Sequence, residues 1–408
     1  MEEKLITKIW AEEIKDSRGN PTIKVTVSVS DISGSFSVPS GASTGAHESW
    51  VIENDKAIFK VNEIIAKALV GKNVLNQKEI DKTMIELDGT PNKNNLGGNS
   101  MIGVSIACAK VAAKVLGQET FEYLRTLAEI KSSLRQSSGQ AKKVPYLYMN
   151  LINGGKHAKD GLAFQEYLVV PETENVKEAV EIGIKIDNSL KEIIKKDLGE
   201  DSLLLGDEGG FAPKTSDIKK PLLYLSEAIK QNNLEGKVKL ALDVASSSFY
   251  QNGKYKVADK EISKEELLDI YNSLIKEFDL LSIEDPFNQE DFESFAELKK
   301  ENNNLLVVGD DLTVSNSILL KKAIENKSIN AMIIKPNQVG TLTETLETMK
   351  LARENNIELI VSHRSGETDD DFIADLAYAF GVFGLKAGAP TKPERMVKYE
   401  RLIRITNY

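Results

Sequence analysis

Six short apolar runs in the second half of the chain each end on a residue whose side chain can take part in chemistry. The runs end, in order, on Asp243, Glu284, Asp310, Lys335, His363 and Lys386. Successive end residues lie 41, 26, 25, 28 and 23 positions apart, which leaves room for one strand, one covering helix and two loops. Apolar strands that alternate with helices predict a parallel sheet buried on both faces. Several such units can close into a β/α barrel, whose catalytic groups lie at the carboxyl ends of the strands.

The length and composition are those of an ordinary globular protein with room for a barrel and a smaller domain. The chain has 408 residues, of which 41% are hydrophobic and 28% are charged, and a β/α barrel takes roughly 250 residues. The apolar runs fall short of the ~20 residues that cross a membrane, and the first residues lack a signal-peptide pattern. We therefore expect no membrane partner and a cytoplasmic location.

Charge and cysteine content narrow the classes of function further. The formal net charge of -10 argues against nucleic acids and anionic membranes as partners. The single cysteine, Cys108, cannot form an internal disulfide, which suits a reducing compartment. It stands among apolar residues, so we expect it to fill the core. With three histidines in the whole chain, a histidine-rich metal site is excluded.

The predicted fold is α/β, with a small N-terminal α+β domain before a C-terminal β/α, TIM-like barrel. Residues 22–29 alternate with a period of two and predict a half-buried strand. Helical apolar spacing predicts one helix over residues 58–69 and a second over residues 99–116, N-capped by Asn99. We assign residues 1–135 to the small domain, the polar, serine-rich residues 136–143 to a linker, and residues 144–408 to the barrel.

Three of the strand-end residues are carboxylates on consecutive predicted strands. In a barrel, Asp243, Glu284 and Asp310 would converge on one spot, where they repel one another unless a cation lies between them. Oxygen ligands without Cys or His select a hard divalent ion, most simply Mg²⁺. For each carboxylate alone, the alternative is a helix N-cap in the following loop. Lys335 and Lys386 would neutralise a substrate anion or serve as a general base, or else form structural ion pairs with Asp310 or Glu284.

Glycine-containing loops supply further candidate residues. Glu208 stands between glycines in residues 206–210, where the backbone can approach a ligand closely. Arg364 and Ser365 follow His363 and offer a positive fork and a hydroxyl, a suitable cradle for a phosphate. Residues 40–45 could present backbone N–H groups to an anion, but they lack the lysine of a phosphate-binding loop and could be only a flexible linker.

Together these motifs resemble those of the enolase family, in the family's order and over nearly the whole chain. The segments that carry the resemblance are residues 16–22 (Asp-Ser-Arg-Gly-Asn-Pro-Thr), 40–45, 153–158 (Asn-Gly-Gly-Lys-His-Ala), 165–166, 206–213, 282–286, 309–311, 335–338, 362–367 and 386–390. The resemblance implies reversible dehydration of 2-phosphoglycerate to phosphoenolpyruvate in glycolysis and gluconeogenesis. It also implies an enolase-type barrel that begins with an irregular antiparallel hairpin, and a homodimer or a higher homo-oligomer.

The resemblance also implies a role for each candidate residue. Asp243, Glu284 and Asp310 match the ligands of a first Mg²⁺, while Ser43 matches the residue of a mobile loop that closes over the substrate and joins a second Mg²⁺. Lys335 matches the base that removes the C2 proton, and Glu208 the acid that helps hydroxide to leave C3. The remaining residues match groups around the substrate, with Lys386 at its carboxylate: His157, Gln165, Glu166, His363, Arg364, Ser365 and Lys386.

Some positions depart from the family pattern, and two other functions stay open. Residues 50–55 (Trp-Val-Ile-Glu-Asn-Asp) stand where many members have Leu-Arg-Asp-Gly-Asp, and Lys392-Pro393 stands where Arg-Ser is common. One alternative is a racemase or cycloisomerase of the same superfamily, although Phe164-Gln165-Glu166 stands where those enzymes have Lys-x-Lys. The other is a catalytically impaired paralogue with a binding role.

Overall fold

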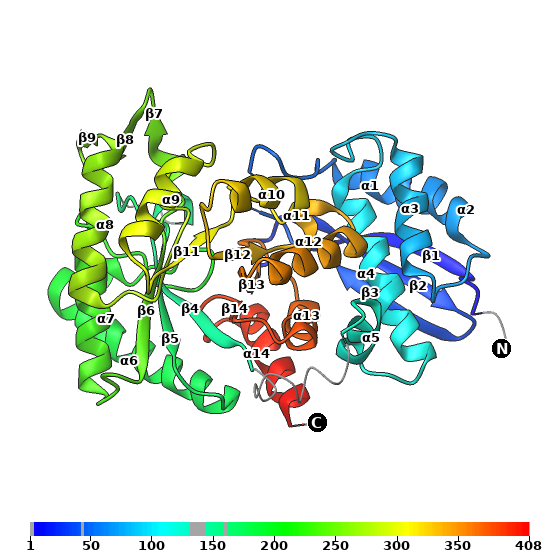
Figure 1. The fold of residues 1–408 in the computed structure, drawn as a ribbon. Helices are drawn as coiled ribbons and strands as arrows, with labels where there is room; N and C mark the ends of the chain where they lie inside the picture. Colours follow the sequence, from blue (N-terminus) through cyan, green and yellow to red (C-terminus); the bar gives the residue numbers. More distant parts are fainter. Residues whose placement is uncertain (1–3, 42–44, 131–143, 158–160, 408) are drawn as a thin grey trace.

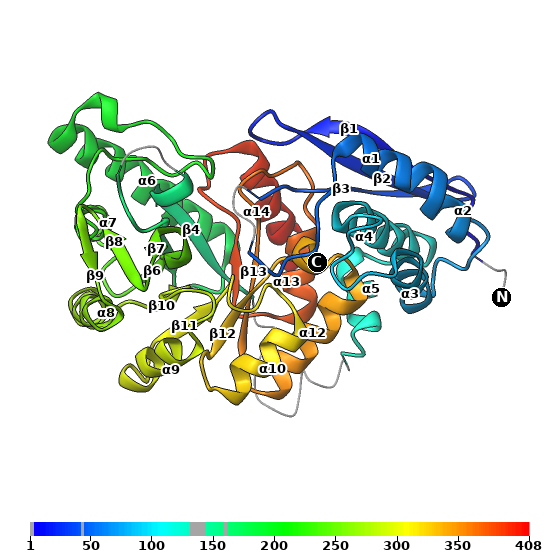
Figure 2. The ribbon, with the colours of Figure 1, turned by 90° about the horizontal axis from the view of Figure 1, so that it is seen from above.

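The computed structural model describes residues 4–41, 45–130, 144–157 and 161–407. An N-terminal unit of sheet and helices lies beside a barrel surrounded by helices (Figures 1 and 2). This arrangement confirms the predicted α/β class with a smaller α+β unit before a barrel. The residues predicted to form a linker, 136–143, lie outside the described residues.

The N-terminal unit pairs an antiparallel sheet with a layer of helices. In the described residues the sheet has the order β1 (Lys8–Lys15), β2 (Pro21–Val29), β3 (Ile32–Ser37). The helices are α1 (Asn54–Phe59), a π-helical turn (Lys60–Ile65), α2 (Ala66–Leu69), α3 (Gln77–Asp88), α4 (Gly98–Val115) and α5 (Thr120–Leu127). The predicted strand is confirmed as β2. The first predicted helix is one continuous segment from α1 to α2, and it contains the π turn.

Helix α4 forms the core of this unit and packs on β2 and β3. Gly34 permits this close approach, because a Cβ there would lie 2.5 Å from the backbone nitrogen of Val111. Cys108 is fully buried, as predicted. The prediction that Asn99 is the N-cap is wrong, because the N-cap is Gly97 and the helix begins at Gly98. The side chain of Asn99 instead bonds the backbone N–H and carbonyl of Ile52.

The π turn has a recognisable structural use. It contains Asn62, whose amide pairs with both backbone groups of Ala11 on β1, at 2.7 Å to the N–H and 3.2 Å to the carbonyl. Strand β1 is an edge of the sheet, and exposed edges offer unpaired backbone groups to other chains. The amide therefore occupies part of this edge as a neighbouring strand would.

The barrel closes from eight strands in the part of the chain that the structure describes. Their order around the ring is β10, β11, β12, β13, β14, β4, β5, β6. Their bounds are β4 (Tyr146–Asn153), β5 (Glu166–Pro171), β6 (Val238–Asp243), β10 (Ser282–Glu284), β11 (Leu306–Gly309), β12 (Ala331–Ile334), β13 (Glu358–Ser362) and β14 (Gly384–Lys386). The six strands predicted from the apolar runs, β6 and β10 to β14, pair in parallel as expected. Strand β5 runs antiparallel to both β4 and β6, which is the hairpin implied by the family resemblance.

The reversal follows from the connection between β4 and β5. No helix covers the described part of that connection, which has a short 3-10 turn at Gly155–His157, so the chain folds straight back. Parallel strands need a longer crossover. The reversal places the first residue of β5, Glu166, opposite the last residue of β6, Asp243. A residue at the start of one strand thereby joins the carboxyl ends of the others.

Helices cover the outside of the barrel (Figure 1). They are α6 (Val176–Leu198), α7 (Lys220–Gln231), α8 (Lys264–Phe278), α9 (Phe292–Glu301), α10 (Ser317–Glu325), α11 (Pro336–Val339), α12 (Leu342–Glu354), α13 (Phe372–Phe380) and α14 (Pro393–Thr406). A small sheet of β7 (Tyr250–Gln251), β8 (Lys254–Val257) and β9 (Lys260–Ile262) follows β6. Within the described residues no single helix is long and apolar enough to cross a membrane; only the bent pair α4 and α5, taken together, passes by length and composition.

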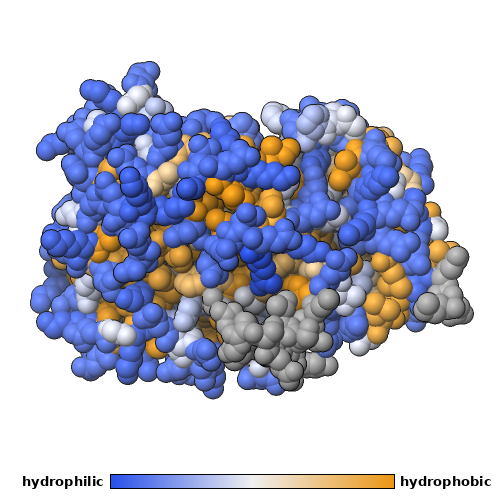
Figure 3. Space-filling model, viewed as in Figure 1, coloured by the Kyte–Doolittle hydropathy of each residue, from blue (hydrophilic) through white to orange (hydrophobic). Residues whose placement is uncertain are grey.

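Apolar side chains fill the barrel interior, so the interior is not a channel. The inward-facing cluster consists of Tyr148, Leu168, Val170, Ala241, Val308, Ala331, Ile333 and Ile360, all of which are buried. The larger core lies between strands and helices, while the outer face seen in Figure 3 is largely hydrophilic. A ligand can therefore reach the barrel only at its ends.

The N-terminal unit and the barrel share a buried polar joint at the start of α12. The N–H of Thr343 donates to Asp81 on α3 at 2.9 Å, and the N–H of Leu342 donates to Ser105 on α4 at 2.9 Å. Ser105 in turn donates to Asp81 at 2.6 Å. The first N–H groups of a helix have no partner within the helix, so the N-terminal unit caps this barrel helix. Asp81 is fully buried, and its burial raises the pKa of its carboxyl.

We expect Asp81→Ala to lower the free energy of unfolding by about 3 kcal/mol, because it leaves buried N–H and hydroxyl donors without an acceptor. Urea unfolding followed by circular dichroism measures this change. Asp269→Ala, at an exposed position on α8, is the control and should stay within about 0.5 kcal/mol of the parent chain. Equal effects of the two substitutions would contradict the role given to the joint.

Candidate active site

The candidate residues meet in a narrow crevice at the carboxyl end of the barrel strands. Its described lining includes His157, Gln165, Glu166, Glu208, Asp243, Asp310, Lys335, His363, Arg364, Ser365 and Lys386. Glu284 lies directly beside it and contacts Lys386. Every predicted site residue that the structure describes is therefore in one place. The remaining one, Ser43, lies outside the described residues.

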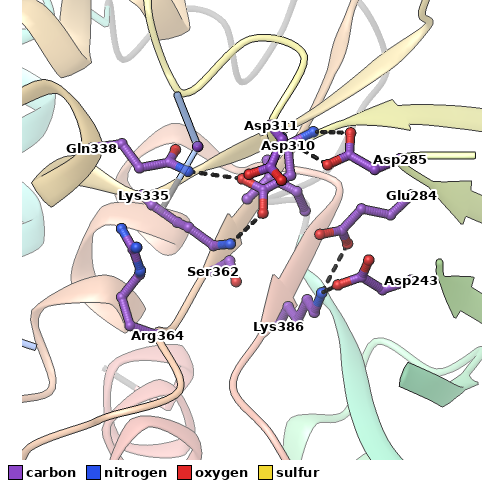
Figure 4. A network of polar contacts seen from close by, with 12 residues as sticks. Asp243, Glu284, Asp285, Asp310, Asp311, Lys335, Gln338, Ser362, Arg364 and Lys386 are labelled. Carbon is purple, nitrogen blue, oxygen red and sulfur yellow. Dashed lines mark hydrogen bonds and ion pairs between the residues drawn. The ribbon is translucent and has the colours of Figure 1, made fainter. Parts of the chain in front are cut away.

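Lys386 occupies the centre of a carboxylate cluster (Figure 4). Its ammonium nitrogen lies 2.9 Å from Asp243 Oδ2, 2.9 Å from Glu284 Oε2 and 3.1 Å from Glu166 Oε2. Strand register explains this convergence, since Asp243 pairs with both Glu284 and Glu166 across neighbouring strands. Burial opposes the charge of Lys386, but the surrounding carboxylates hold its pKa well above the ordinary value.

Lys335 and Asp310 form a second ion pair, between the residues that follow β12 and β11. Gln338 donates to the same carboxylate, from Nε2 to Asp310 Oδ1, at 3.0 Å. Burial would lower the pKa of Lys335, but the charge of Asp310 raises it above the ordinary value. Both lysines thus make the ion pairs that were the structural alternative to a catalytic role.

Asp285 fixes the geometry of this region, a role that no sequence motif indicated. Its two carboxylate oxygens accept the backbone N–H groups of Asp310 at 2.9 Å and Asp311 at 2.7 Å. Those two bonds turn the chain after β11 so that the carboxylate of Asp310 faces Lys335 (Figure 4). Asp285 therefore lines the crevice and also orients Asp310 and Asp311.

Glu208 lies on the opposite side of the crevice, in contact with an amide and two imidazoles. Asn150 donates to its Oε2 at 2.8 Å, while His157 Nδ1 and His363 Nε2 lie 3.5 Å and 3.4 Å from its Oε1. The flanking glycines are needed for packing, because a Cβ at Gly206 would lie 2.6 Å from the side chain of Asn153. The loop is therefore pressed against β4.

The carboxyls of Glu208 and Glu166 have opposite proton affinities. Burial raises the pKa of Glu166 well above its usual range, and the negative charge of Glu208 adds to the effect. Burial also acts on Glu208, but His157, His363 and Arg395 outweigh it and hold its pKa well below the usual range. His157 Nδ1 lies between the two, 3.9 Å from Glu166 Oε1. Of the two carboxyls, Glu166 therefore has the higher proton affinity.

Arg364 lines the crevice and is held by Glu48. Its Nη1 is 3.0 Å from Glu48 Oε2 and its Nη2 is 3.3 Å from Glu48 Oε1, and both side chains are about 5% exposed. Glu48 Oε1 also accepts the backbone N–H of Gly45 at 2.9 Å. Ser40 and Gly366 exchange backbone hydrogen bonds of 2.8 Å. The N-terminal unit thus contacts the predicted phosphate cradle directly.

Comparison with known proteins agrees with this geometry. The family models described as "Enolase, N-terminal domain" and "Enolase, C-terminal TIM barrel domain" match residues 6–124 and 141–408. Proteins named enolase from Methanocaldococcus jannaschii and Methanopyrus kandleri are 43% and 42% identical to this chain, over 98% of it and over 94% and 95% of their own lengths. Enolase B of Dictyostelium discoideum is 42% identical over 98% of the chain and 94% of its own length.

The chain belongs to the enolase family.

The enolase family uses Mg²⁺, and the carboxylates described here suit such an ion. Burial and the charge of Asp243 raise the pKa of Glu284 well above its usual range even though Lys386 and Lys335 oppose the shift. Among the described residues, no hydrogen-bond donor reaches Glu284 Oε1, although that atom is buried. Asp285, Asp310 and Asp311 also have carboxylate oxygens within 4.8 Å of one another. Oxygen-only donors of this kind are the ligands that Mg²⁺ prefers.

We expect Glu48→Gln to increase the affinity of the crevice for inorganic phosphate by at least about fivefold, because a neutral amide competes less well for the guanidinium of Arg364. Calorimetric titration with phosphate measures the change. Glu290→Gln alters an exposed carboxylate of the barrel and should leave the affinity unchanged. Weaker phosphate binding in Glu48→Gln would show that Glu48 orients Arg364 instead of competing for it.

Proposed function

We propose that this member of the enolase family is a phosphopyruvate hydratase, a lyase that interconverts 2-phosphoglycerate and phosphoenolpyruvate in glycolysis and gluconeogenesis. The observation that carries the proposal is the pairing of two opposed proton-handling groups, Lys335 and Glu208, in one crevice. Removing a proton beside a carboxylate and expelling a hydroxide from the next carbon needs a base and an acid on different sides of the substrate. Full-length similarity to enolases supports the same reaction.

We propose that Asp243, Glu284 and Asp310 hold a first Mg²⁺, and that Ser43 contributes to a second that arrives with the substrate. The ions would neutralise the charge that develops on the substrate carboxylate when the C2 proton leaves. The buried, unpaired oxygen of Glu284 and the crowding of the carboxylates support the first site. Lys386, now bound to these carboxylates, would then be free to contact the substrate carboxylate.

We expect Asp310→Asn to weaken Mg²⁺ binding by at least about tenfold, because it removes a charged ligand from an oxygen-only site. Asp269→Asn, on the outer surface, is the matched control for the loss of one negative charge. Calorimetric titration of each variant with Mg²⁺ gives the affinities. An unchanged affinity in Asp310→Asn would contradict the shared metal site, whatever happens to activity.

We propose that Lys335 removes the C2 proton and that Glu208 assists the departure of hydroxide from C3. To act as a base, Lys335 must first lose its proton. Asp310 opposes this loss because its negative charge stabilises the ammonium form. A bound cation would draw the carboxylate of Asp310 away from Lys335. The pKa of Glu208 is lowered and that of Glu166 is raised, and His157 lies between the two carboxyls. We infer that this pair supplies the proton that hydroxide needs. Gln165, His363, Arg364 and Ser365 would complete the substrate contacts.

The two proposed roles predict different failures. Lys335→Ala should lose both elimination and exchange of the C2 hydrogen with solvent deuterium, because the carbanion never forms. Glu208→Gln should lose elimination by about 10²-fold or more and still exchange that hydrogen, because the carbanion forms and is protonated again. Proton NMR of 2-phosphoglycerate in deuterated buffer follows exchange, and enol absorbance follows elimination. The reverse pattern would exchange the roles of the two residues.

The alternative of a catalytically impaired paralogue is tested by the same enol absorbance, measured on the purified chain with Mg²⁺ and 2-phosphoglycerate. No turnover would support it. We further propose that residues 1–135 act as a domain that caps the barrel of residues 144–408, which agrees with the contacts of Ser40 and Glu48 at the crevice.

The assembly and the compartment of the protein are also proposals. A homodimer would cover some of the apolar side chains that the single chain exposes, such as Trp50 and Phe59. Sedimentation equilibrium would measure the assembly. The buried free thiol of Cys108 agrees with the reducing cytoplasm as the compartment.

A further inference from the structure

Helix α14, which follows the last barrel strand, carries one long side chain that packs against the loops of the active site. Arg395 is completely buried and is the largest side chain in the described residues that has no solvent contact. It fits because Gly388 has no Cβ: one placed there would lie 3.0 Å from Arg395 Cδ and 2.9 Å from the carbonyl oxygen of Glu208. The guanidinium therefore reaches the region between the loop that carries Glu208 and the loop that carries His363.

The guanidinium joins these two loops through hydrogen bonds. Nη1 donates to the carbonyl of Arg364 at 2.7 Å and also contacts His363 Nδ1. Nη2 donates to the carbonyls of Ser365 at 2.7 Å and Asp207 at 3.1 Å. Asp207 directly precedes Glu208, so one rigid, planar group fixes both the proposed acid loop and the proposed phosphate cradle.

The contact with His363 determines where the imidazole carries its hydrogen. A guanidinium has donors and no acceptor, so Nδ1 of His363 must offer its lone pair. Burial lowers the pKa of His363 well below the ordinary value, so the ring is neutral. A neutral ring with an unprotonated Nδ1 carries its hydrogen on Nε2. That Nε2 lies 3.4 Å from Glu208 Oε1 and has no hydrogen-bond partner among the described residues. Glu208 Oε1 is therefore a nearby acceptor for a hydrogen on Nε2, although the bond is not completed in this geometry.

We propose that Arg395 is a positioning residue that holds His363 in the Nε2–H tautomer and so keeps a hydrogen-bond donor beside Glu208. The consequence for catalysis rests on the proposed role of Glu208, while the tautomer itself does not. Without Arg395, the Nδ1 of His363 could take the hydrogen and donate to a backbone carbonyl, leaving two lone pairs facing each other at Nε2 and Glu208. The charged groups around the ring come from four elements and are Glu208, Arg395, Lys386 and Lys335.

The chain offers a direct measurement, because it contains three histidines. Long-range ¹H–¹⁵N spectra of protein with ¹⁵N-labelled histidine distinguish the two neutral tautomers of each ring. His47→Gln assigns the surface ring, and His157→Gln assigns the second. In the parent chain near pH 7.5 we expect His363 to show a protonated Nε2 and a bare Nδ1. A protonated Nδ1 in the parent chain would overturn the proposal without any variant at position 395.

Two substitutions test whether Arg395 is the cause. Arg395→Met removes the donors, so His363 should lose its single tautomer, and Arg395→Lys should retain it in part because a lysine can still donate. Arg401→Lys is the matched control: Arg401 lies on the same helix and bonds Asp375 and Glu119, away from the crevice. It should leave both the tautomer and turnover as they are. An unchanged His363 spectrum in Arg395→Met would overturn the proposal.

Kinetics separates positioning from a general loss of structure. In Arg395→Met, or in Arg395→Lys if the first variant does not fold, we expect elimination to fall by about 10²-fold or more while exchange of the C2 hydrogen falls much less. Equal losses in Arg395→Lys and Arg401→Lys would overturn the positioning role. A changed tautomer with exchange and elimination lost in parallel would support the effect of Arg395 on His363 and contradict the acid role of Glu208.

Discussion

Buried negative charge at the carboxyl end of the barrel is the constraint on which the rest of this site depends. Asp243 and Glu284 are paired across neighbouring strands, and Asp310 follows the next strand, so these carboxylates have no way to separate. Charges taken out of water are costly unless cations and hydrogen bonds compensate them. The ammonium groups of Lys386 and Lys335 supply that compensation within the chain. Any cation or substrate that enters must displace or share these contacts, so binding and catalysis begin from an already balanced site.

The second side of the crevice meets the same constraint with proton sharing instead of ion pairing. Glu166 and Glu208 are both buried, and their pKa values are shifted in opposite directions. Imidazoles and an amide contact Glu208, while Lys386 contacts Glu166. The site therefore has one region in which lysines pair with carboxylates and another in which one of two carboxyls has the higher proton affinity. A reaction that removes a proton on one side and delivers one on the other needs this division.

The sequence was sufficient to predict the barrel, the strand-end residues and the small N-terminal unit, because each depends on local apolar patterning. It could not give the direction of β5, since alternation fixes the faces of a strand and not its polarity. It also misplaced the N-cap at Asn99, whose amide has a partner 47 positions earlier in the chain, Ile52. Residues such as Arg395 and Asp285 were missed for a related reason. Their partners are mostly backbone groups, which carry no side-chain identity that a sequence pattern could show.

The polar joint at the start of α12 limits how far the two units can evolve or be exchanged independently. A barrel helix whose first N–H groups bond Asp81 and Ser105 is complete only in the presence of its own N-terminal unit. Exchanging that unit for one with apolar residues at these two positions would bury unsatisfied donors within the barrel. Chimaeras between relatives should therefore be tolerated only when this small set of residues moves together. Although each unit has its own secondary structure, the joint requires the donors of the barrel and the acceptors of the N-terminal unit to be kept together.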